Sequence, residues 1–304
     1  MRAIQYAEFG PPEVLELVEL PEPHAAPDQI RVVVNAVGVN PVDWKFRRGT
    51  MGGDLPRRTG LEVAGVVDEV GDEIADVTAG DHVFGPVAGG NGAADFALLA
   101  AYAPIPAALD FVGAAALPVA VETAWRTLDR LGVGEGMTIV VNGASGSVGV
   151  STVQLARERG AAVIGTAGEA NQEYVRSFGA QATTYGPGLA ERVRALAGGE
   201  GAVVDRALDD AGGGALPSLI ELTGDPDRVL TIADFEDGPR LGVQMSGGPD
   251  EPRAWQALSA VTELVEAGRF TLPVAETFEL EGIAEAHRLS ETMHARGKIV
   301  LLVD

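Results

Sequence analysis

Short apolar runs, separated by clusters of glycine, proline and aspartate, dominate the chain up to about residue 102. Residues 30–36 and 63–70 are two of these runs, and both are rich in valine. Runs of this length and composition are typical of β-strands, and the clusters between them are typical of turns. The pattern predicts an irregular, β-rich domain for the first third of the chain.

From about residue 119 the pattern changes to an apolar strand, a turn and a helix-period segment, repeated several times. The predicted strands are residues 137–141, 161–166, 182–185, 202–207 and 228–232, and the predicted helices are residues 148–159, 172–178, 189–196, 215–222 and 255–267. Strands that alternate with helices form a parallel sheet with helices on its faces. Six such strands, these five and a last one, would make a doubly wound domain.

After Gly268 the β-rich pattern returns, with a strand at residues 277–280, a helix at residues 283–293 and a last apolar strand at residues 298–303. We expect this tail to complete the first domain. Residues 1–118 and 269–304 would then form a substrate domain, and residues 119–268 would form an inserted α/β domain. Ligands of such sheets tend to bind in the cleft beside the inserted domain.

Composition excludes several classes of protein. The formal net charge is -22, which disfavours nucleic-acid and anionic membrane partners. The absence of cysteine excludes disulfides, thiolate metal sites and cysteine nucleophiles, so any redox chemistry needs a bound cofactor. Residues 1–6 lack the apolar core of a signal peptide, and the longest apolar run, residues 111–121, is too short to span a bilayer. We expect a cytoplasmic protein without a membrane partner.

A glycine-rich turn follows the first strand of the α/β part and precedes a helix. Glycines in this position allow a positive φ and let the backbone approach a pyrophosphate, whose charge then meets the free N–H groups of the helix. The alternative is a tight turn of the kind found in any α/β protein, but the strand, turn and helix context favours a dinucleotide. The predicted cofactor-binding residues of this turn are Gly143, Ala144, Ser145, Gly146, Ser147, Val148 and Gly149.

The end of the second strand bears on which dinucleotide binds. In many sites an acidic residue about 20 positions after the glycines binds the ribose 2′-hydroxyl and selects NAD. Here Thr166, Ala167 and Gly168 stand at the strand end, which leaves room for a 2′-phosphate before Asn171 and favours NADPH. Glu169 follows directly and the first cation after it is Arg176, so NADH stays possible.

Five further motifs occur in a fixed order along the chain. They are Gly38-Val-Asn-Pro-Val-Asp43, Gly60-Leu-Glu-Val-Ala-Gly65, Gly80-Asp-His-Val-Phe-Gly85, Ala115-Ala-Leu-Pro118 with Thr123-Ala124, and Arg296-Gly-Lys-Ile-Val-Leu301. With the glycine turn, this set resembles the zinc-free quinone oxidoreductase branch of the medium-chain dehydrogenase/reductase superfamily over the whole chain. The resemblance implies a Rossmann cofactor domain inserted in a GroES-like substrate domain, an α/β fold.

The resemblance also bears on metal binding. In the zinc alcohol dehydrogenases of this superfamily the position of Leu61 holds histidine, and a cysteine lies in the segment that matches Gly38 to Asn40. Both ligands are missing here, and the histidines at 24, 82, 287 and 294 have no ligand spacing. We therefore expect no metal and interpret the four histidines as surface or packing residues.

By position, the resemblance implies four catalytic residues. Asn40 would line the cleft beside the nicotinamide and bond a substrate carbonyl, with Asp43 and Lys45 orienting Asn40 or a ribose hydroxyl, and Thr123 would reach the nicotinamide end. The alternatives are a turn residue before Pro41, solvated surface charges and a helix-surface threonine. Several relatives have tyrosine in place of Lys45, so the substrate can differ.

Four more cofactor residues follow from the resemblance. Tyr185 would pack near the adenine unless it is a core aromatic. Backbone groups of Ile232 and Ala233 would bond the carboxamide, and Lys298 would lie near the cofactor unless it is a solvated charge. Glu62 is interpreted as a structural anchor of loops, so water or a ribose hydroxyl would deliver the proton.

The predicted function is NADPH-dependent reduction of a quinone or of the activated C=C bond of an enone, by hydride transfer without metal. An enoyl-thioester reductase is the alternative enzyme, and an NADPH-binding redox sensor or structural protein is the alternative outside enzymes. The resemblance also implies a homodimer in which edge strands of the nucleotide domains pair. The segment from Leu241 to Met245 is the candidate edge, or else an ordinary last strand.

Overall fold

The computed structural model describes residues 1–199, 201–248 and 250–304, and it contains two compact units. Unit 1 consists of Met1–Val119 and Trp255–Asp304, and unit 2 consists of Ala120–Ala254. The expected boundary after residue 268 therefore differs from the structure. Helix α9 (Ala257–Glu266) contacts strand β8 (Ala103–Pro104), and this contact places it in unit 1.

Unit 2 is built on a six-stranded sheet in the order β11-β10-β9-β12-β13-β14, and all neighbouring strands are parallel. The chain starts in the middle of the sheet, winds to one edge, crosses back and winds to the other edge, which is the Rossmann order. The strands are β9 (Thr138–Asn142), β10 (Ala162–Thr166), β11 (Gln181–Thr183), β12 (Arg206–Asp209), β13 (Val229–Thr231) and β14 (Gln244–Met245).

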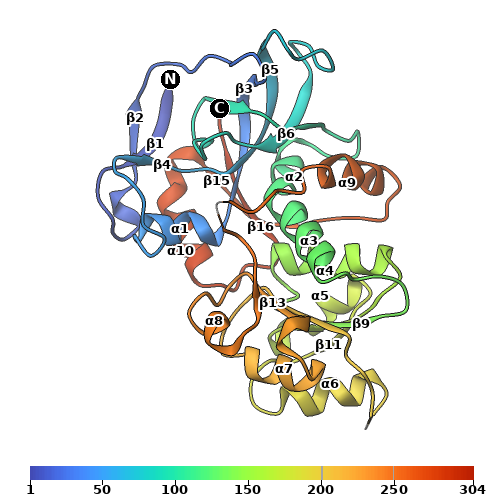
Figure 1. Ribbon diagram of the computed structural model, residues 1–304. Helices are drawn as coiled ribbons and strands as arrows, with labels where there is room; N and C mark the ends of the chain where they lie inside the picture. Colours follow the sequence, from blue (N-terminus) through green and yellow to red (C-terminus); the bar gives the residue numbers. More distant parts are fainter. Residues whose placement is uncertain (200, 249) are drawn as a thin grey trace. The chain divides into compact units, whose positions relative to one another are not determined.

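Helices connect these strands. Helix α4 packs on β9 and β10, and α6 and α7 lie side by side (Figure 1). Apolar side chains from both layers, among them Val140, Ile164 and Leu219, are fully buried and form the core between sheet and helices. The helices are α3 (Pro118–Arg130), which starts at the end of unit 1, α4 (Ser147–Glu158), α5 (Gln172–Ser177), α6 (Leu189–Ala197), α7 (Leu216–Thr223) and α8 (Asp237–Leu241), with short 3-10 helices η2 (Glu169–Asn171) and η3 (Pro226–Arg228).

The last strand of unit 2 is shorter than expected. Leu241 ends α8 instead of starting a strand, because Gly242 adopts a left-handed φ of 74° and stops the helix. Only Gln244 and Met245 then pair with β13, so the edge strand of the sheet has two residues. The predicted strand lies at the edge of the sheet, but Leu241 is helical and residues 242–243 connect the helix to the strand.

Unit 1 has a seven-stranded sheet and a three-stranded sheet in the order β2-β1-β4. The seven-stranded sheet runs β15-β16-β3-β5-β6-β8, with β7 also paired to β3, so the C-terminal strands lie beside β3. Its strands are β3 (Ile30–Val39), β5 (Glu62–Val70), β6 (His82–Pro86), β7 (Phe96–Leu99), β8, β15 (Val274–Glu279) and β16 (Lys298–Leu302). The small sheet contains β1 (Arg2–Tyr6), β2 (Glu16–Glu19) and β4 (Arg57–Arg58).

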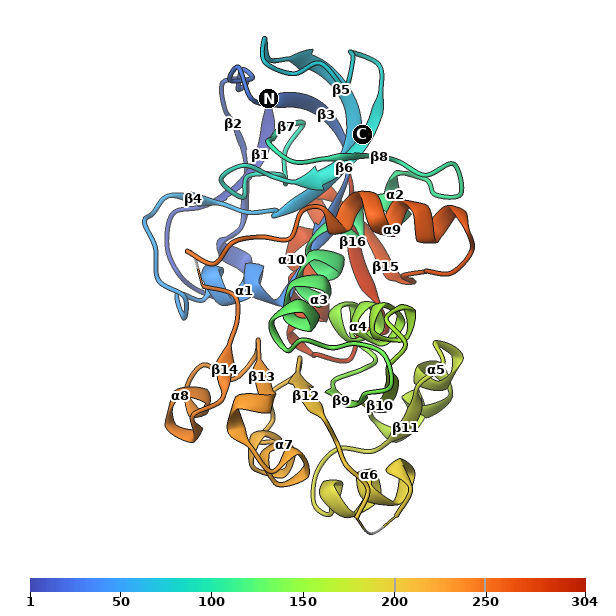
Figure 2. The same cartoon turned by 45° about the vertical axis from the view of Figure 1, so that its right-hand side comes forward.

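The helices of unit 1 complete its core. Helix α10 packs against α1, and the two lie side by side (Figure 2). Besides α9, the helical elements are α1 (Pro41–Arg47), α2 (Phe111–Ala115) and α10 (Ile283–Glu291), with 3-10 helices η1 (Pro12–Val14) and η4 (Leu280–Gly282). No helix in the described ranges has the length and apolar character needed to cross a bilayer.

Candidate active site

Asn40 stands where the long strand β3 turns into helix α1. It is the residue before the helix, and Pro41 in the first helical position favours the start of a helix there. The Asn40 backbone N–H donates to Asp43 Oδ2 over 2.7 Å, and the Thr59 hydroxyl donates to Asp43 Oδ1 over 3.4 Å. Asp43 therefore fixes the turn from the strand into the helix.

The Asn40 side chain lies between two buried charges. Its Oδ1 accepts a hydrogen bond from Lys298 Nζ over 2.6 Å, and its Nδ2 donates to Glu62 Oε1 over 2.7 Å. Lys298 also forms an ion pair with Glu62. Asn40 is 4% exposed, Lys298 1% and Glu62 0%. The predicted alternative of a solvated Lys298 is therefore wrong.

This arrangement fixes the orientation of the Asn40 amide. An ammonium only donates hydrogen bonds and a carboxylate only accepts them. A flipped amide would place its NH2 group against Lys298 and its oxygen against Glu62, which would lose two charge-assisted hydrogen bonds. Within the described residues Nδ2 makes only its bond to Glu62, so one N–H of Asn40 remains for a ligand.

Strand register brings these groups together. Gly38 on β3 is opposite Glu62 on β5, and Val39 is opposite Ile299 on β16, the neighbour of Lys298. Gly38 is needed at this point, because a Cβ there would lie 2.5 Å from Glu62 Oε1. Glu62 Oε2 also accepts a hydrogen bond from the backbone N–H of Val119 over 2.7 Å. Glu62 therefore links Asn40, β16 and the start of α3.

Asp43 is the titratable group of this cluster. Burial raises the pKa of Asp43 to about 7, against the lowering effects of the Asn40 hydrogen bond and of the Lys298 charge, and the Glu62 charge raises it further. Two carboxylates share one buried ammonium here, so the cluster is electrically balanced when Asp43 holds a proton. The predicted alternative of a solvated Asp43 is wrong.

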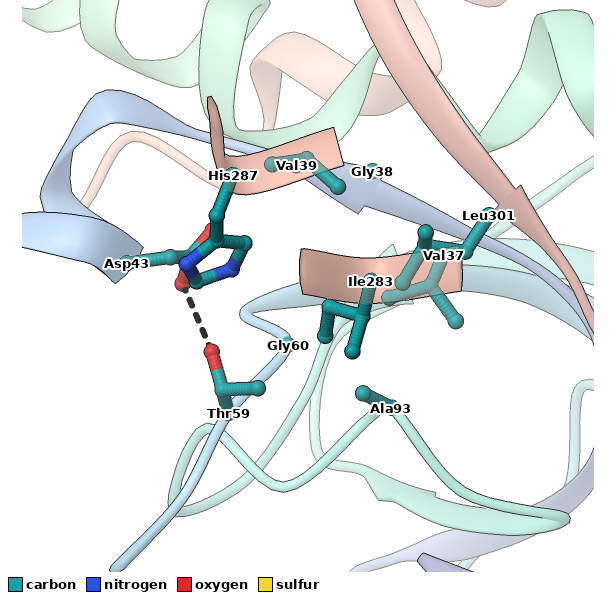
Figure 3. Close-up of a pocket in the computed structure, with 10 residues that line it drawn as sticks. All are labelled: Val37, Gly38, Val39, Asp43, Thr59, Gly60, Ala93, Ile283, His287 and Leu301. Atoms are coloured by element: carbon teal, nitrogen blue, oxygen red, sulfur yellow. Dashed lines mark hydrogen bonds between the residues drawn. The ribbon is translucent and has the colours of Figure 1, made fainter. Parts of the chain in front are cut away.

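A small pocket lies next to Asp43. Figure 3 shows Asp43, Thr59 and His287 lining it together with apolar side chains of β3 and α10. His287 is 1% exposed, and its Nδ1 has no hydrogen-bond partner in the part of the chain that the structure describes. Burial lowers the pKa of His287 to about 3, so the ring is neutral. This fits the interpretation of His287 as a packing residue.

The other two predicted catalytic residues do not join this cluster by hydrogen bonds. Lys45 lies on α1, half-buried, with its ammonium 5.8 Å from the centre of the Trp44 ring. Thr123 lies in unit 2 on α3 and is 9% exposed, so it is not a helix-surface residue, and its carbonyl accepts a hydrogen bond from the Thr127 hydroxyl over 2.8 Å.

The glycine-rich turn has the shape of a pyrophosphate cradle. Gly143 has a φ of 91°, and a Cβ at Gly149 would lie 2.2 Å from the Gly143 carbonyl oxygen. A Cβ at Gly146 would meet no atom nearer than 3.7 Å, so the backbone there is open. The first hydrogen bond within α4 runs from Val150 N to Gly146 O over 2.8 Å. The three preceding N–H groups, those of Ser147, Val148 and Gly149, therefore face outward from the helix start and fit a phosphate.

A buried polar network supports this cradle, and sequence reasoning missed most of it. Asn142 Nδ2 donates to Asp209 Oδ1 over 2.8 Å, and the Thr166 hydroxyl donates to Asn142 Oδ1 over 2.6 Å. The Thr231 hydroxyl donates to Asp209 Oδ2 over 2.8 Å. These side chains stand at the ends of four neighbouring strands. Polar residues at the ends of several predicted strands are a sequence signal from which this network could have been predicted. The Thr166 hydroxyl, predicted to bind cofactor, also accepts from the Gly143 N–H over 3.2 Å and so braces the turn.

Ile232 and Ala233 follow β13 directly, at the same end of the sheet. The N–H of Ile232 donates to the Asp209 carbonyl over 3.0 Å, and the N–H of Ala233 donates to the Thr231 hydroxyl over 3.1 Å. Both N–H groups are therefore used inside unit 2. The carboxamide of a bound nicotinamide would therefore have to donate its N–H groups to the backbone carbonyls of this segment.

Asp210 is a second functional candidate that the sequence did not indicate. Its Oδ2 lies 3.5 Å from the Thr152 hydroxyl on α4, and its Oδ1 is buried with no partner among the described residues. Burial, followed by the charge of Asp209, raises the pKa of Asp210 well above its usual value. The charged form of this carboxyl is therefore disfavoured at its place beside Thr152.

The segments after β10 and β11 come together as the predicted adenosine end. Tyr185 is 60% exposed, and its hydroxyl lies 3.9 Å from where a Gly168 Cβ would be, so the alternative of a core aromatic is wrong. Gln172 Nε2 donates to the carbonyls of Ala167 over 2.8 Å and Thr183 over 3.0 Å, which ties the two segments together. Asn171 closes the turn through its N–H, which donates to the Gly168 carbonyl over 2.9 Å.

Two arginines lie near this end of unit 2. Arg176 forms an ion pair with Glu173 on the surface of α5. Arg192 on α6 instead donates to the carbonyls of Thr184 over 2.9 Å and Tyr185 over 3.2 Å. No carboxylate of the described residues pairs with Arg192. It is the candidate cation that sequence spacing missed, because it lies well beyond the strand end where such a cation is usually sought.

The described residues of the two units offer no converging set of metal ligands. Across residues 1–199, 201–248 and 250–304, no group of three or more His, Asp or Glu side chains is placed to hold a metal ion. His24 pairs with Glu69 over 3.2 Å at the surface, and the His82 ring packs at a tilt of 47° against Phe111, with ring centres 4.8 Å apart.

The chain matches two family models, "Alcohol dehydrogenase GroES-like domain" over residues 26–125 and "Zinc-binding dehydrogenase" over residues 188–301. The quinone oxidoreductase of Lama guanicoe is 32% identical over 100% of this chain and 98% of its own length. The 2-methylene-furan-3-one reductase of Solanum lycopersicum is 30% identical over 99% of this chain and 79% of its own length. The solved structure of the quinone oxidoreductase from Coxiella burnetii is 28% identical, with a TM-score of 0.86, over 100% of this chain and 99% of that one.

These likenesses extend over both units. They confirm the predicted α/β fold class, a Rossmann unit inserted in a GroES-like one, and they place the chain among enzymes. The chain belongs to the quinone oxidoreductase branch of the medium-chain dehydrogenase/reductase superfamily, and it is an oxidoreductase.

Proposed function

We propose that the protein reduces quinones, or the activated C=C bond of enones, with NADPH and without a metal. The observation that carries this proposal is the Asn40 amide, whose orientation is set by Lys298 and Glu62 and whose remaining N–H is a fixed donor. A donor held in place before the reaction stabilises the negative charge that builds on a carbonyl oxygen during hydride addition. Relatives named quinone oxidoreductase and 2-methylene-furan-3-one reductase support these two acceptor classes.

The chemistry of the redox step is that of the cofactor, which supplies the hydride when it is bound. The residues of unit 2 fit a dinucleotide. The N–H groups of Ser147, Val148 and Gly149 would hold the pyrophosphate. Tyr185 and Gly168 would hold the adenosine end, and Thr123, Ile232 and Ala233 would hold the nicotinamide end. This leaves Asn40 as the group that binds and polarises the acceptor, while solvent or a ribose hydroxyl delivers the proton.

NADPH is proposed over NADH because of the residues after β10. Ala167 and Gly168 are small and uncharged, so they leave space for a 2′-phosphate and present no carboxylate to repel it. Arg192 on α6 bonds to the carbonyls of Thr184 and Tyr185, and it supplies a cation that pairs with no carboxylate of the described residues. Metal independence is proposed because Leu61 stands where zinc alcohol dehydrogenases have a histidine ligand, and because the chain has no cysteine.

The test is oxidation of NADPH in the presence of 1,4-benzoquinone or methyl vinyl ketone, with and without a metal chelator. Asn40→Ala should lower kcat/KM by about a hundredfold, the usual effect of removing one donor to a developing oxyanion. The Kd of NADPH, measured by fluorescence, should stay unchanged. The double variant Glu62→Gln with Lys298→Met frees the amide to rotate without leaving a lone buried charge, and it should lose part of the same activity.

Three outcomes separate the alternatives. Turnover of crotonyl thioesters with no turnover of quinones or enones would indicate an enoyl-thioester reductase. NADPH binding without turnover of any of these acceptors would contradict the proposal. Loss of activity with a chelator, restored by zinc, would contradict metal independence. A cytoplasmic location and a homodimer stay predictions that rest on the sequence and on the family.

A further inference from the structure

Positive charge gathers on helix α1 and strand β4 of an otherwise acidic protein. The chain holds 22 lysines and arginines against 44 acidic residues. Five of these cations fall within one stretch of unit 1, namely Lys45, Arg47, Arg48, Arg57 and Arg58. Arg47 and Arg48 share Glu291 on α10 as their partner. Lys45, Arg57 and Arg58 have no ion pair with any described residue, so their charge is not neutralised.

Aromatic rings hold two of these cations in place. The guanidinium of Arg57 lies 3.8 Å from the centre of the Phe46 ring, and the ammonium of Lys45 lies 5.8 Å from the centre of the Trp44 ring. A ring face attracts a cation through its quadrupole but leaves the net charge intact. The side chains are therefore positioned without being neutralised, which is what a site for an anionic group requires.

Lys45 is also partly withdrawn from water. Burial lowers the pKa of Lys45, and no carboxylate of the described residues raises it again. A half-buried ammonium without a partner is less stable than a solvated one, because it has lost hydration and gained no opposite charge. A bound anion would recover that loss.

These cations flank the segment that positions Asn40. Lys45 lies on the helix that Asn40 precedes, and Arg57 contacts Phe46 of the same helix. On the other side, Thr59 follows β4 directly and bonds to Asp43, the residue that fixes the Asn40 backbone. All of these contacts lie within unit 1, so the cations and the Asn40 amide belong to the same compact unit.

We propose that the acceptor reduced by this enzyme carries an anionic group, a carboxylate or a phosphate, which Lys45 and Arg57 bind while its carbonyl meets Asn40. The proposal rests on the proposed function and adds the substrate class. Charge-assisted hydrogen bonds to carboxylate or phosphate are the strong interactions that lysine and arginine make. Relatives with tyrosine in place of Lys45 would lack this preference.

The kinetic test compares acceptors that differ by one charge. Acetylacrylate is an enone with a carboxylate, and its amide is the neutral match. Crotonyl phosphopantetheine and crotonyl pantetheine form the corresponding phosphate pair and distinguish the two sources of anion. The wild type should prefer the anionic member of at least one pair by about tenfold in kcat/KM. Lys45→Gln and Arg57→Gln should each lower kcat/KM for the anionic acceptor more than for its neutral match, and so remove most of that preference.

A binding measurement separates this proposal from the proposed function. Levulinate and levulinamide are saturated analogues, and calorimetry measures their affinity without turnover. Levulinate should bind about tenfold more tightly, and Lys45→Gln should abolish the difference even if the acceptor chemistry has been assigned wrongly. If the wild type prefers the anionic member of the thioester pair, the same binding comparison is made between phosphopantetheine and pantetheine.

The control is Arg228→Gln, which removes the same charge from an exposed arginine paired with Asp225 in unit 2. It should leave every ratio unchanged. Equal kcat/KM for both members of both pairs in the wild type would overturn the proposal. So would variants of Lys45 and Arg57 that lower the charged and neutral acceptors by the same factor.

Discussion

Asn40 depends on residues that the chain supplies from distant positions. Glu62 and Lys298 come from strands β5 and β16, and their closeness to Asn40 follows from how those strands pair with β3. The sequence motifs marked Asn40, Asp43 and Lys298 as candidates, and the structure brings these three together. The sequence could not predict which way the Asn40 amide faces. That orientation depends on the register between strands far apart in the chain, which a local sequence pattern does not encode. For the same reason, the sequence predicted that Glu62 anchors loops but could not predict which residues it bonds to.

Asp43 should make the stability of the protein depend on pH. Because folding raises its pKa to about 7, the folded protein holds a proton that the unfolded chain has already lost. As the pH rises from about 4 to about 7, the titration of Asp43 therefore lowers the free energy of unfolding, by roughly 4 kcal/mol at most. Above about pH 7 this titration causes no further change in the free energy of unfolding.

Asp43→Asn keeps an oxygen for the Asn40 N–H and removes the titration. Urea unfolding at several pH values should show a smaller decline of stability for the variant than for the wild type between about pH 4 and 7. Since Lys298 then faces Glu62 alone, the variant should also be the more stable protein at about pH 8. Parallel profiles for the two proteins would contradict the assignment of this titration to Asp43.

Elements with a strong local signal were predicted well, and elements set by their neighbours were not. The strand, glycine turn and helix at residues 138–158 follow from apolar runs and glycine spacing, and β9 and α4 begin within one residue of the predicted positions. In contrast, β12 begins at Arg206, four residues after the predicted start, because its pairing with β9 begins only there. Tyr185 could not be placed from sequence, because its exposure depends on how the segment after β11 is held by Arg192.

The segment between β11 and α6 should decide cofactor choice through Arg192. This guanidinium bonds to the carbonyls of Thr184 and Tyr185 and has no carboxylate partner among the described residues. Arg192→Gln removes the charge and part of the hydrogen bonding that holds Tyr185 near Gly168. We expect the Kd of NADPH to rise about tenfold and that of NADH less than twofold, since only NADPH carries the additional phosphate.

The readout for Arg192 is fluorescence titration of each cofactor, which does not depend on the acceptor. Arg194→Gln is the matched control, because Arg194 lies on the same helix and pairs with Glu221 at the surface. A variant of Arg192 that weakens both cofactors equally would mean that the residue supports the fold of the segment and does not recognise the phosphate.

At the scale of the whole molecule, the acidic charge and the edge of the Rossmann sheet bear on assembly. A net charge of -22 favours solubility and opposes self-association, so a dimer needs a specific interface. Among the described residues, strand β14 has no neighbour on its outer side, and its residue Met245 is 38% exposed. Arg130 donates to the Met245 carbonyl over 2.6 Å. Edges of this kind pair with a second copy when nothing covers them.

We therefore predict a homodimer through β14, with a mass twice the 31.4 kDa of the chain. Met245→Lys places a like charge on both copies where the edges meet, so it should shift the protein to monomer by light scattering after size exclusion. Val203→Lys is the matched control, because Val203 is another exposed apolar residue of unit 2, 63% exposed, but it precedes the interior strand β12 and not the sheet edge. It should stay dimeric. A wild type that elutes as a monomer at tens of micromolar would contradict the predicted dimer. A Met245→Lys variant that stays dimeric would mean that the interface lies elsewhere.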